Sequence, residues 1–181
     1  MKNVLSIVVM VILTASLNSC EKIKSWFNVD IDTNIEGMMD VVSNDVALKS
    51  TEAYSLNGSA TIDLSDNDDL ADYTDLIEDI EVHSVSLSVV SIDSSGVMIL
   101  AGSEFSISST DNPGITWPIT SDWPITAGTY VTLDSDDYSV LNDMLQGDTP
   151  VTFRSTGSCN KGNVHIELTY DIDVTVTANP S

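Results

Sequence analysis

The residues best suited to contact a ligand are two tryptophans, Trp117 and Trp123, which lie six residues apart. Each begins the same segment, Trp-Pro-Ile-Thr, so Pro118 and Pro124 stiffen the backbone beside both rings. A stiff backbone with large amphipathic rings loses little entropy on contact, which suits a preorganised binding surface for sugars or extended peptides. The alternative is that both rings close the open end of the fold. In either case the prolines confine this segment to a loop or a sheet edge.

Closely spaced carboxylates form the densest cluster of candidate metal ligands. Hard cations such as Ca²⁺ take oxygen ligands, and the cluster consists of Asp63, Asp66, Asp68, Asp69 and Asp72. The segment lacks the glycine and the distal glutamate of an EF-hand loop. Aspartates at such positions also serve as helix caps and as partners of the helix dipole. Calcium is therefore a candidate cofactor at this cluster, and the sequence predicts no other.

Enzyme chemistry has little support among the motifs. His83 and His165 lie in alternating segments, which predict strand positions with His83 facing inward and His165 outward. Cys159 lies between glycines in a segment that indicates an exposed turn. No nucleophile elbow, phosphate loop or zinc-protease spacing is present in the sequence. We therefore expect a protein that is not an enzyme, with a glycan or polymer hydrolase that uses a carboxylate pair as the alternative.

The first twenty residues have the order of an export signal: Lys2, an apolar run over residues 4–17, and a small residue before Cys20. The final segment, Leu17-Asn18-Ser19-Cys20, resembles the lipobox of bacterial lipoproteins, although Asn18 is a less usual residue at its position. The resemblance implies that residues 1–19 are removed, that the Cys20 sulfur receives a diacylglyceryl group, and that its freed amine is acylated, for example with palmitate. Such an anchor holds a protein stably on a membrane.

A transmembrane anchor and an ordinary secretory leader are the alternatives for residues 1–19. A bilayer span needs about 20 predominantly apolar residues, and this run is shorter and lies close to the terminus. We therefore expect a lipid-anchored protein of the bacterial envelope, and the outer membrane or the cell surface is favoured over the inner membrane.

The charge of the chain limits its partners. Twenty-eight acidic residues against six basic ones give a formal net charge of −22. Nucleic acids and anionic lipid headgroups need a basic patch, so the charge argues strongly against both as partners. The acidic residues are spread along the chain, which is typical of a highly solvated surface. A protein or a carbohydrate remains as the expected partner, beside the membrane that the lipid anchor would contact.

Alternating apolar and polar residues predict strands along most of the chain after residue 26. The predicted strands are 27–35, 53–64, 83–89, 97–100, 104–108, 129–133, 151–155 and 164–177. The last alternation is the longest without a break, which predicts a strand that bends or bulges to serve two sheets.

Two segments have helical spacing instead. The first follows the capping residues Ser65-Asp66-Asn67-Asp68, and its apolar residues are Leu70, Tyr73, Ile77 and Ile80. The second follows Ser135-Asp136-Asp137 and ends at Gly147 and Pro150, and its apolar residues are Tyr138, Leu141, Met144 and Leu145.

These elements predict an antiparallel β-sandwich, immunoglobulin-like in general architecture, with two short crossover helices. A closed barrel is the structural alternative. We expect three parts: a signal peptide over 1–19, a tether over 20–26 and a single domain over 27–181. The expected function is that of a membrane-anchored binding or assembly module. A structural envelope lipoprotein without a ligand is the alternative beside the hydrolase.

Overall fold

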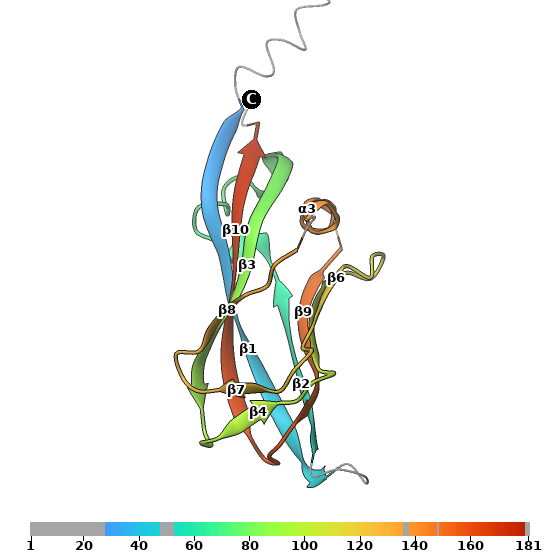
Figure 1. Cartoon of the computed structure of the whole chain (residues 1–181). Coiled ribbons are helices and arrows are strands. Elements are labelled where there is room, and N and C mark those ends of the chain that lie inside the picture. The colour runs from blue at the N-terminus through green and yellow to red at the C-terminus, as the bar shows by residue number, and fades with distance from the viewer. Residues whose placement is uncertain (1–27, 48–52, 136–137, 148, 180–181) are drawn as a thin grey trace, which may run out of the picture.

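The computed structural model describes residues 28–47, 53–135, 138–147 and 149–179, which form an elongated, mainly β molecule (Figure 1). The described residues contain ten strands, one α-helix and two 3₁₀ turns. The strands are β1 (Val29–Ala47), β2 (Tyr54–Ile62), β3 (Ile77–Ile92), β4 (Val97–Ile99), β5 (Glu104–Ser108), β6 (Ile115–Pro118), β7 (Trp123–Ile125), β8 (Tyr130–Thr132), β9 (Val151–Cys159) and β10 (His165–Ala178). The helix is α3 (Ser139–Gln146), and the 3₁₀ turns are η1 (Leu64–Asp66) and η2 (Thr74–Leu76).

All ten strands belong to one antiparallel sheet with the order β6-β5-β9-β2-β1-β10-β3-β8, and β4 joins it by pairing with β9 and β7. The sheet curls on itself. Two strands separate β9 from β10, yet the ring of Phe153 on β9 stacks on that of Tyr170 on β10 with 5.3 Å between their centroids. The predicted mainly antiparallel β class is confirmed. Edge strands β6 and β8 do not pair with each other, and we call the gap between them the seam.

Strand β1 runs the length of the molecule (Figure 1). Its 19 residues span about 60 Å at the usual rise of a strand. It pairs with β10 from Val29 to Val42, whereas its pairing with β2 begins only at Val41. One end of the molecule is therefore a three-stranded ribbon of β1, β10 and β3, and the other end holds the wider curled sheet.

Helix α3 covers the ribbon where β3 has no neighbouring strand, and it buries Leu141, Met144 and Leu145. Its Asn142 side chain accepts a hydrogen bond from the backbone N–H of Val82, at 3.0 Å. The helix thus supplies an acceptor that a further strand would otherwise provide. The second predicted helix is confirmed, and it ends at Gly147 as expected. The predicted cap at Asp136 and Asp137 lies outside the described residues.

Strand β10 confirms the alternation at the end of the chain. Every second residue from Ile166 to Ala178 is buried, and the strand lies between β1 and β3. Its register against β3 shifts at three places, but the extra residue lies on β3 each time, at Val90, His83 and Glu78. The expectation that the last strand itself bulges and serves two sheets is therefore wrong, because β10 runs without an extra residue inside one sheet.

The first predicted helix is wrong. The chain forms 3₁₀ turns at Leu64–Asp66 and Thr74–Leu76 with other turns between them, and Ile77 and Ile80 belong to β3. Short polar side chains cause the difference, because they compete for the backbone groups that a helix would use. The Asn67 side chain accepts from the N–H groups of Asp69 and Leu70 and donates to the Asn34 carbonyl on β1. The segment is thereby fixed to the ribbon as turns, with Leu70 fully buried.

Two predicted side-chain positions are also wrong. His83 is exposed, with its Nε2 atom 2.7 Å from the Thr175 hydroxyl, because the register shift at Asp173/Val174 changes which residues of β3 face inward. Cys159 is fully buried as the last residue of β9, where it pairs with Tyr54 and Ile99, so it does not lie in an exposed turn.

Candidate functional site

A pocket of about 320 Å³ lies at the seam of the sheet, and both predicted tryptophans line it. Its walls come from segments that are far apart in sequence: β5, the stretch from β6 to β7, and β8 with the residues after it. A volume of this size is at the lower end of the range for small-molecule sites. We call it the seam pocket and define it by Phe105, Trp117, Asp122, Trp123, Leu133 and Asp134.

Trp117 holds the two edges of the seam together. It lies on edge strand β6 with its ring buried, and its Nε1–H donates to the backbone carbonyl of Asp134, 2.9 Å away and just beyond β8. A side-chain hydrogen bond thus joins two edges that no strand pairing joins. Tyr138 reinforces the same segment, because its hydroxyl donates to the Leu133 carbonyl at 2.9 Å.

Trp123 is the more accessible of the two tryptophans. It is half-buried on β7, and its ring meets Phe105 edge to face with 6.1 Å between centroids. Phe105 also contacts Phe153, which stacks on Tyr170. Such aromatic pairs contribute about 0.5–1.5 kcal/mol each beyond their buried area. These four rings form a continuous row from the pocket wall to the core, and this row fixes the position of Trp123.

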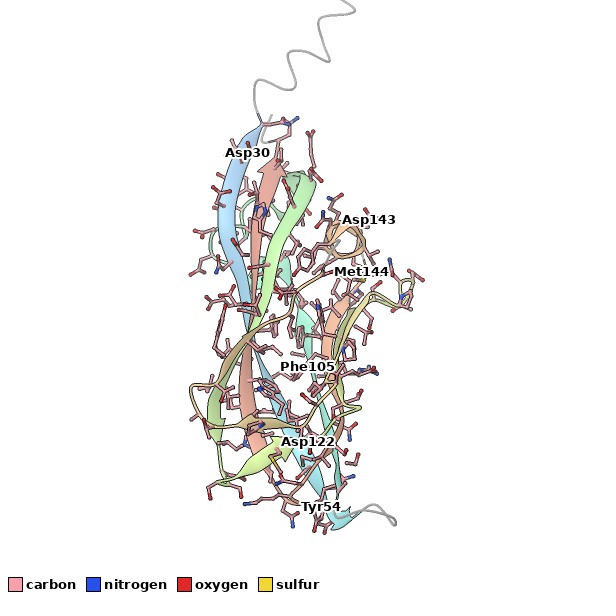
Figure 2. The ribbon with its side chains drawn as sticks, viewed as in Figure 1. Asp30, Tyr54, Phe105, Asp122, Asp143 and Met144 are labelled. Atoms are coloured by element: carbon pink, nitrogen blue, oxygen red, sulfur yellow. The ribbon has the colours of Figure 1, made fainter. Side chains whose placement is uncertain are left out.

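Two carboxylates, from Asp122 and Asp134, give the seam pocket its charge. The Asp122 carboxylate accepts a hydrogen bond from the N–H of Ala101 at 3.0 Å, which fixes its place beside the pocket. Figure 2 shows Asp122 and Phe105 in the part of the molecule that lies toward Tyr54 and away from Asp30. No lysine, arginine or histidine lines the pocket. It is therefore suited to an uncharged or basic ligand.

Sequence reasoning identified the two tryptophans and missed the residues that complete their pocket. Phe105 reads as an ordinary core position of a short strand, and its ring is indeed buried. Asp122 and Asp134 are two among 28 acidic residues. Only the curl of the sheet brings them to the same place, so no local pattern marks them.

Two of the five predicted calcium ligands, Asp63 and Asp69, have hydrogen-bond partners within the protein. Asp63 accepts from the hydroxyl and the N–H of Ser65, and these bonds lower the pKa of Asp63, the hydroxyl having the larger effect. Asp69 accepts from the Thr33 hydroxyl on β1 at 3.0 Å. In the described part of the chain, no three His, Cys, Asp or Glu side chains are grouped as a metal site would need. A calcium site over Asp63, Asp66, Asp68, Asp69 and Asp72 stays a prediction.

The thiol and the imidazoles also have separate partners. The Cys159 thiol donates to the Lys161 carbonyl at 3.0 Å from a buried position. His165 is exposed, as expected, with its Nε2 atom 2.9 Å from a carboxylate oxygen of Asp40. Neither arrangement is that of a nucleophile beside its base.

The predicted lipidation site, Cys20, lies outside the described residues, as do the signal peptide and the tether. Among the helices that the structure describes, none is both long and apolar enough to span a bilayer.

Comparisons with known proteins give no family for the chain. No family model matches it, and no curated protein matches it. A solved structure that it resembles is the cryo-EM structure of the semi-empty virus-like particle of giant freshwater prawn Macrobrachium rosenbergii nodavirus. That match has 11% identity and a TM-score of 0.34, and it covers 84% of this chain and 98% of the other.

Proposed function

We propose that this chain is a lipid-anchored lipoprotein of the bacterial envelope whose β domain binds a ligand in the seam pocket and catalyses no reaction. The proposal rests on one observation: Trp117 and Trp123 line a single pocket between the two edges of the sheet. The anchor at Cys20 rests on the resemblance of its sequence to a lipobox. We also infer that the two halves of the sheet act as the layers of a β-sandwich, since Phe153 and Tyr170 stack between them.

A carbohydrate is the ligand class that best fits the seam pocket. Sugar rings pair an apolar face with hydroxyl groups, so they suit an aromatic ring such as Trp123 beside polar side chains. Thr120, Ser121 and Asp122 supply such polar groups around the ring. The absence of basic side chains from the lining favours an uncharged sugar over an acidic one.

The place of the pocket along the molecule suits an anchored protein. Asp30 lies near the end where β1 begins, and Asp122 lies toward the opposite end, near Tyr54 (Figure 2). If Cys20 carries the lipid, the chain enters β1 from the membrane side. The seam pocket would then be held away from the membrane surface, in reach of a ligand on either the outer membrane or the cell surface.

The lipid anchor is tested with Cys20→Ser in the full chain. We expect the native chain to incorporate labelled palmitate and to lose residues 1–19, and the variant to take up no label and to keep residues 1–19. A native chain that takes up no label and keeps residues 1–19 would contradict the lipoprotein proposal and favour a transmembrane anchor.

Binding is tested by screening the chain against glycans and peptides and comparing Trp123→Ala with Tyr130→Ala. Tyr130 is 63% exposed on β8 and does not line the pocket, so it is a matched control for loss of an aromatic ring. We expect glycan binding that is lost from Trp123→Ala and kept by Tyr130→Ala, with both variants folded by circular dichroism. Binding to peptides alone would change the ligand class. No binding at all would favour a purely structural envelope role.

A hydrolase is the second candidate, because two carboxylates, Asp122 and Asp134, line the same pocket. A carboxylate pair is the usual machinery for cleaving a glycosidic bond. Asp122→Asn and Asp134→Asn distinguish the two functions. Turnover that either change abolishes would establish an enzyme, whereas unchanged binding with no turnover in the native chain supports the binding module.

A further inference from the structure

The outer face of the sheet has two parts that differ in charge. Where β1 pairs with β10, outward carboxylates recur on both strands: Asp30, Asp32, Glu36, Asp40, Glu167, Asp171 and Asp173. The part formed by β2, β9 and β5 is different. One cross-strand row there is Ser59, Arg154 and Ser106, and hydroxyl and amide side chains fill most of the neighbouring outward positions. The second part is nearly neutral and has an arginine at its centre.

Arg154 is the sole arginine of the chain, and it is exposed on β9. Its guanidinium makes no hydrogen bond and no ion pair with the residues that the structure describes. The other described basic side chain, Lys161, donates to the Ser95 carbonyl instead. Among 28 acidic residues, an arginine fork without a carboxylate partner is unexpected, because this is the pairing that its geometry favours.

The carboxylates closest to Arg154 in the sheet have other partners. Asp40 lies beside it in the same groove, but its carboxylate is 2.9 Å from the His165 imidazole. Glu104 lies on β5 opposite Thr156 and accepts from that hydroxyl at 3.4 Å. Both acids therefore lie near Arg154 in the sheet, but neither forms an ion pair with its guanidinium. Its five donors are open to a ligand.

A groove of about 440 Å³ surrounds Arg154, and no apolar side chain lines it. We call it the arginine groove and define it by Asp40, Asn57, Ser59, Arg154, Ser155 and Thr156. Hydroxyls and amides both donate and accept hydrogen bonds, so these walls match a ligand that is rich in hydroxyl groups. An apolar peptide side chain would find no partner here. The lining thus points to a polar ligand, and the free guanidinium points to one acidic group on it.

We propose that the arginine groove binds a sugar that bears a carboxylate, such as a uronic acid residue of a glycan. The carboxylate pairs with the Arg154 fork through two parallel hydrogen bonds, and the sugar hydroxyls meet Asn57, Ser59 and Thr156. A single carboxylate fits better than a polyanion, because the net charge of −22 repels densely charged chains. This site is separate from the seam pocket, with which it shares no lining residue.

The test is a titration of the full-length chain in detergent with glucuronic acid, with glucose as the neutral match and glucose 6-phosphate as the other anion. Binding is read from chemical-shift changes and calorimetry. We expect glucuronic acid to bind at least about tenfold more tightly than either comparison ligand. Arg154→Gln should weaken it by about tenfold to a hundredfold, which is the usual value of hydrogen bonds to a charged group. Arg154→Lys should keep part of the affinity, since it keeps the charge and loses the fork.

Two controls separate this site from the rest of the molecule. Lys161→Gln removes a positive charge whose ammonium group already donates to the Ser95 carbonyl, so it should leave the affinity for glucuronic acid unchanged. Trp123→Ala changes the seam pocket alone and should also leave glucuronic acid binding unchanged, so a failure of the proposed function would not affect this result. Equal affinity of the native chain and Arg154→Gln would overturn the proposal. Tighter binding of glucose 6-phosphate would overturn the choice of a carboxylate.

Discussion

The indole of Trp117 stabilises the seam through a hydrogen bond that the sequence does not predict. Its Nε1–H bridges the seam to the Asp134 carbonyl, whereas Trp123 contributes only ring contacts to Phe105. We therefore expect Trp117→Phe to lower the free energy of unfolding by about 1–3 kcal/mol, through the lost hydrogen bond and the smaller ring. Urea denaturation measures this loss.

Trp123→Phe is the matched control for that measurement. It makes the same chemical change in the same repeated segment without breaking a bond across the seam, so its effect should be about 1 kcal/mol or less. Equal losses for the two variants would show that the hydrogen bond of Trp117 does not hold the seam.

Tyr170 makes stability depend on alkaline pH. Burial, and then the negative charge of Asp66, raise the pKa of Tyr170 above its usual value of 10.0. The folded state then holds the phenol proton more tightly than the unfolded chain does. This contribution to stability is complete below pH about 10 and is lost as the pH rises through the folded-state pKa.

We predict that Tyr170→Phe makes the decline of unfolding free energy above pH 10 less steep. At neutral pH the variant should be less stable by about 1 kcal/mol, because the Tyr170 hydroxyl no longer donates to the Thr61 carbonyl. Denaturation curves from pH 8 to 12 show both effects. Tyr130→Phe, at an exposed position, should leave the slope as it is. An unchanged slope in Tyr170→Phe would contradict the prediction.

At the scale of the elements, the β1–β10 pair contains like charges directly opposite each other. Glu36 faces Asp171, and Asp40 faces Glu167. Like charges in such positions are destabilising, and opposite charges contribute about 0.2–1 kcal/mol. Glu36→Lys should therefore raise the free energy of unfolding by about 0.5–1 kcal/mol. Adding Asp171→Asn to Glu36→Lys should remove most of this gain in unfolding free energy. If the gain persists in the double variant, it does not come from the pair of residues 36 and 171.

Alternation in the sequence predicts the elements well where a strand buries one face only. β10 and β5 follow this rule, and β5 begins and ends at the predicted residues. The second half of β1 does not, because Met38 and Val42 are exposed apolar residues beside the buried Met39 and Val41. Consecutive apolar residues interrupt the alternation of apolar and polar side chains, so the predicted first strand ends at residue 35 whereas β1 continues to Ala47.

Helical spacing alone misled the prediction for residues 65–80. Leu70 and Ile80 are both buried, but Leu70 lies on a turn that packs against the ribbon, whereas Ile80 lies on β3, which is a strand of the ribbon itself. The decisive interactions come from Asn67, whose partner Asn34 is on another element. A contact between distant segments has no local signature. The same reason explains why the tryptophans of the seam pocket were found and its other walls were not.

At the scale of the whole molecule, the net charge of −22 sets the response to salt. Raising the ionic strength from about 0.01 M to 0.15 M shortens the Debye length from about 30 Å to 8 Å. Screening then weakens repulsion among the carboxylates of the folded state, so we expect the Tm to rise by a few degrees. Differential scanning calorimetry at several NaCl concentrations measures it. A Tm that falls with salt would show that attractive pairs dominate.

The β1–β10 ladder also decides how the molecule would respond to mechanical force. Val29 pairs with Ala178 at one end of the ladder and Val42 with His165 at the other, so the backbone bonds lie side by side along one line. A pull on the start of β1, resisted at the far end of the sheet, would load these bonds together in shear instead of opening them one at a time. The long first strand would then serve as a stiff stalk, able to carry tension between a fixed end and whatever the protein holds.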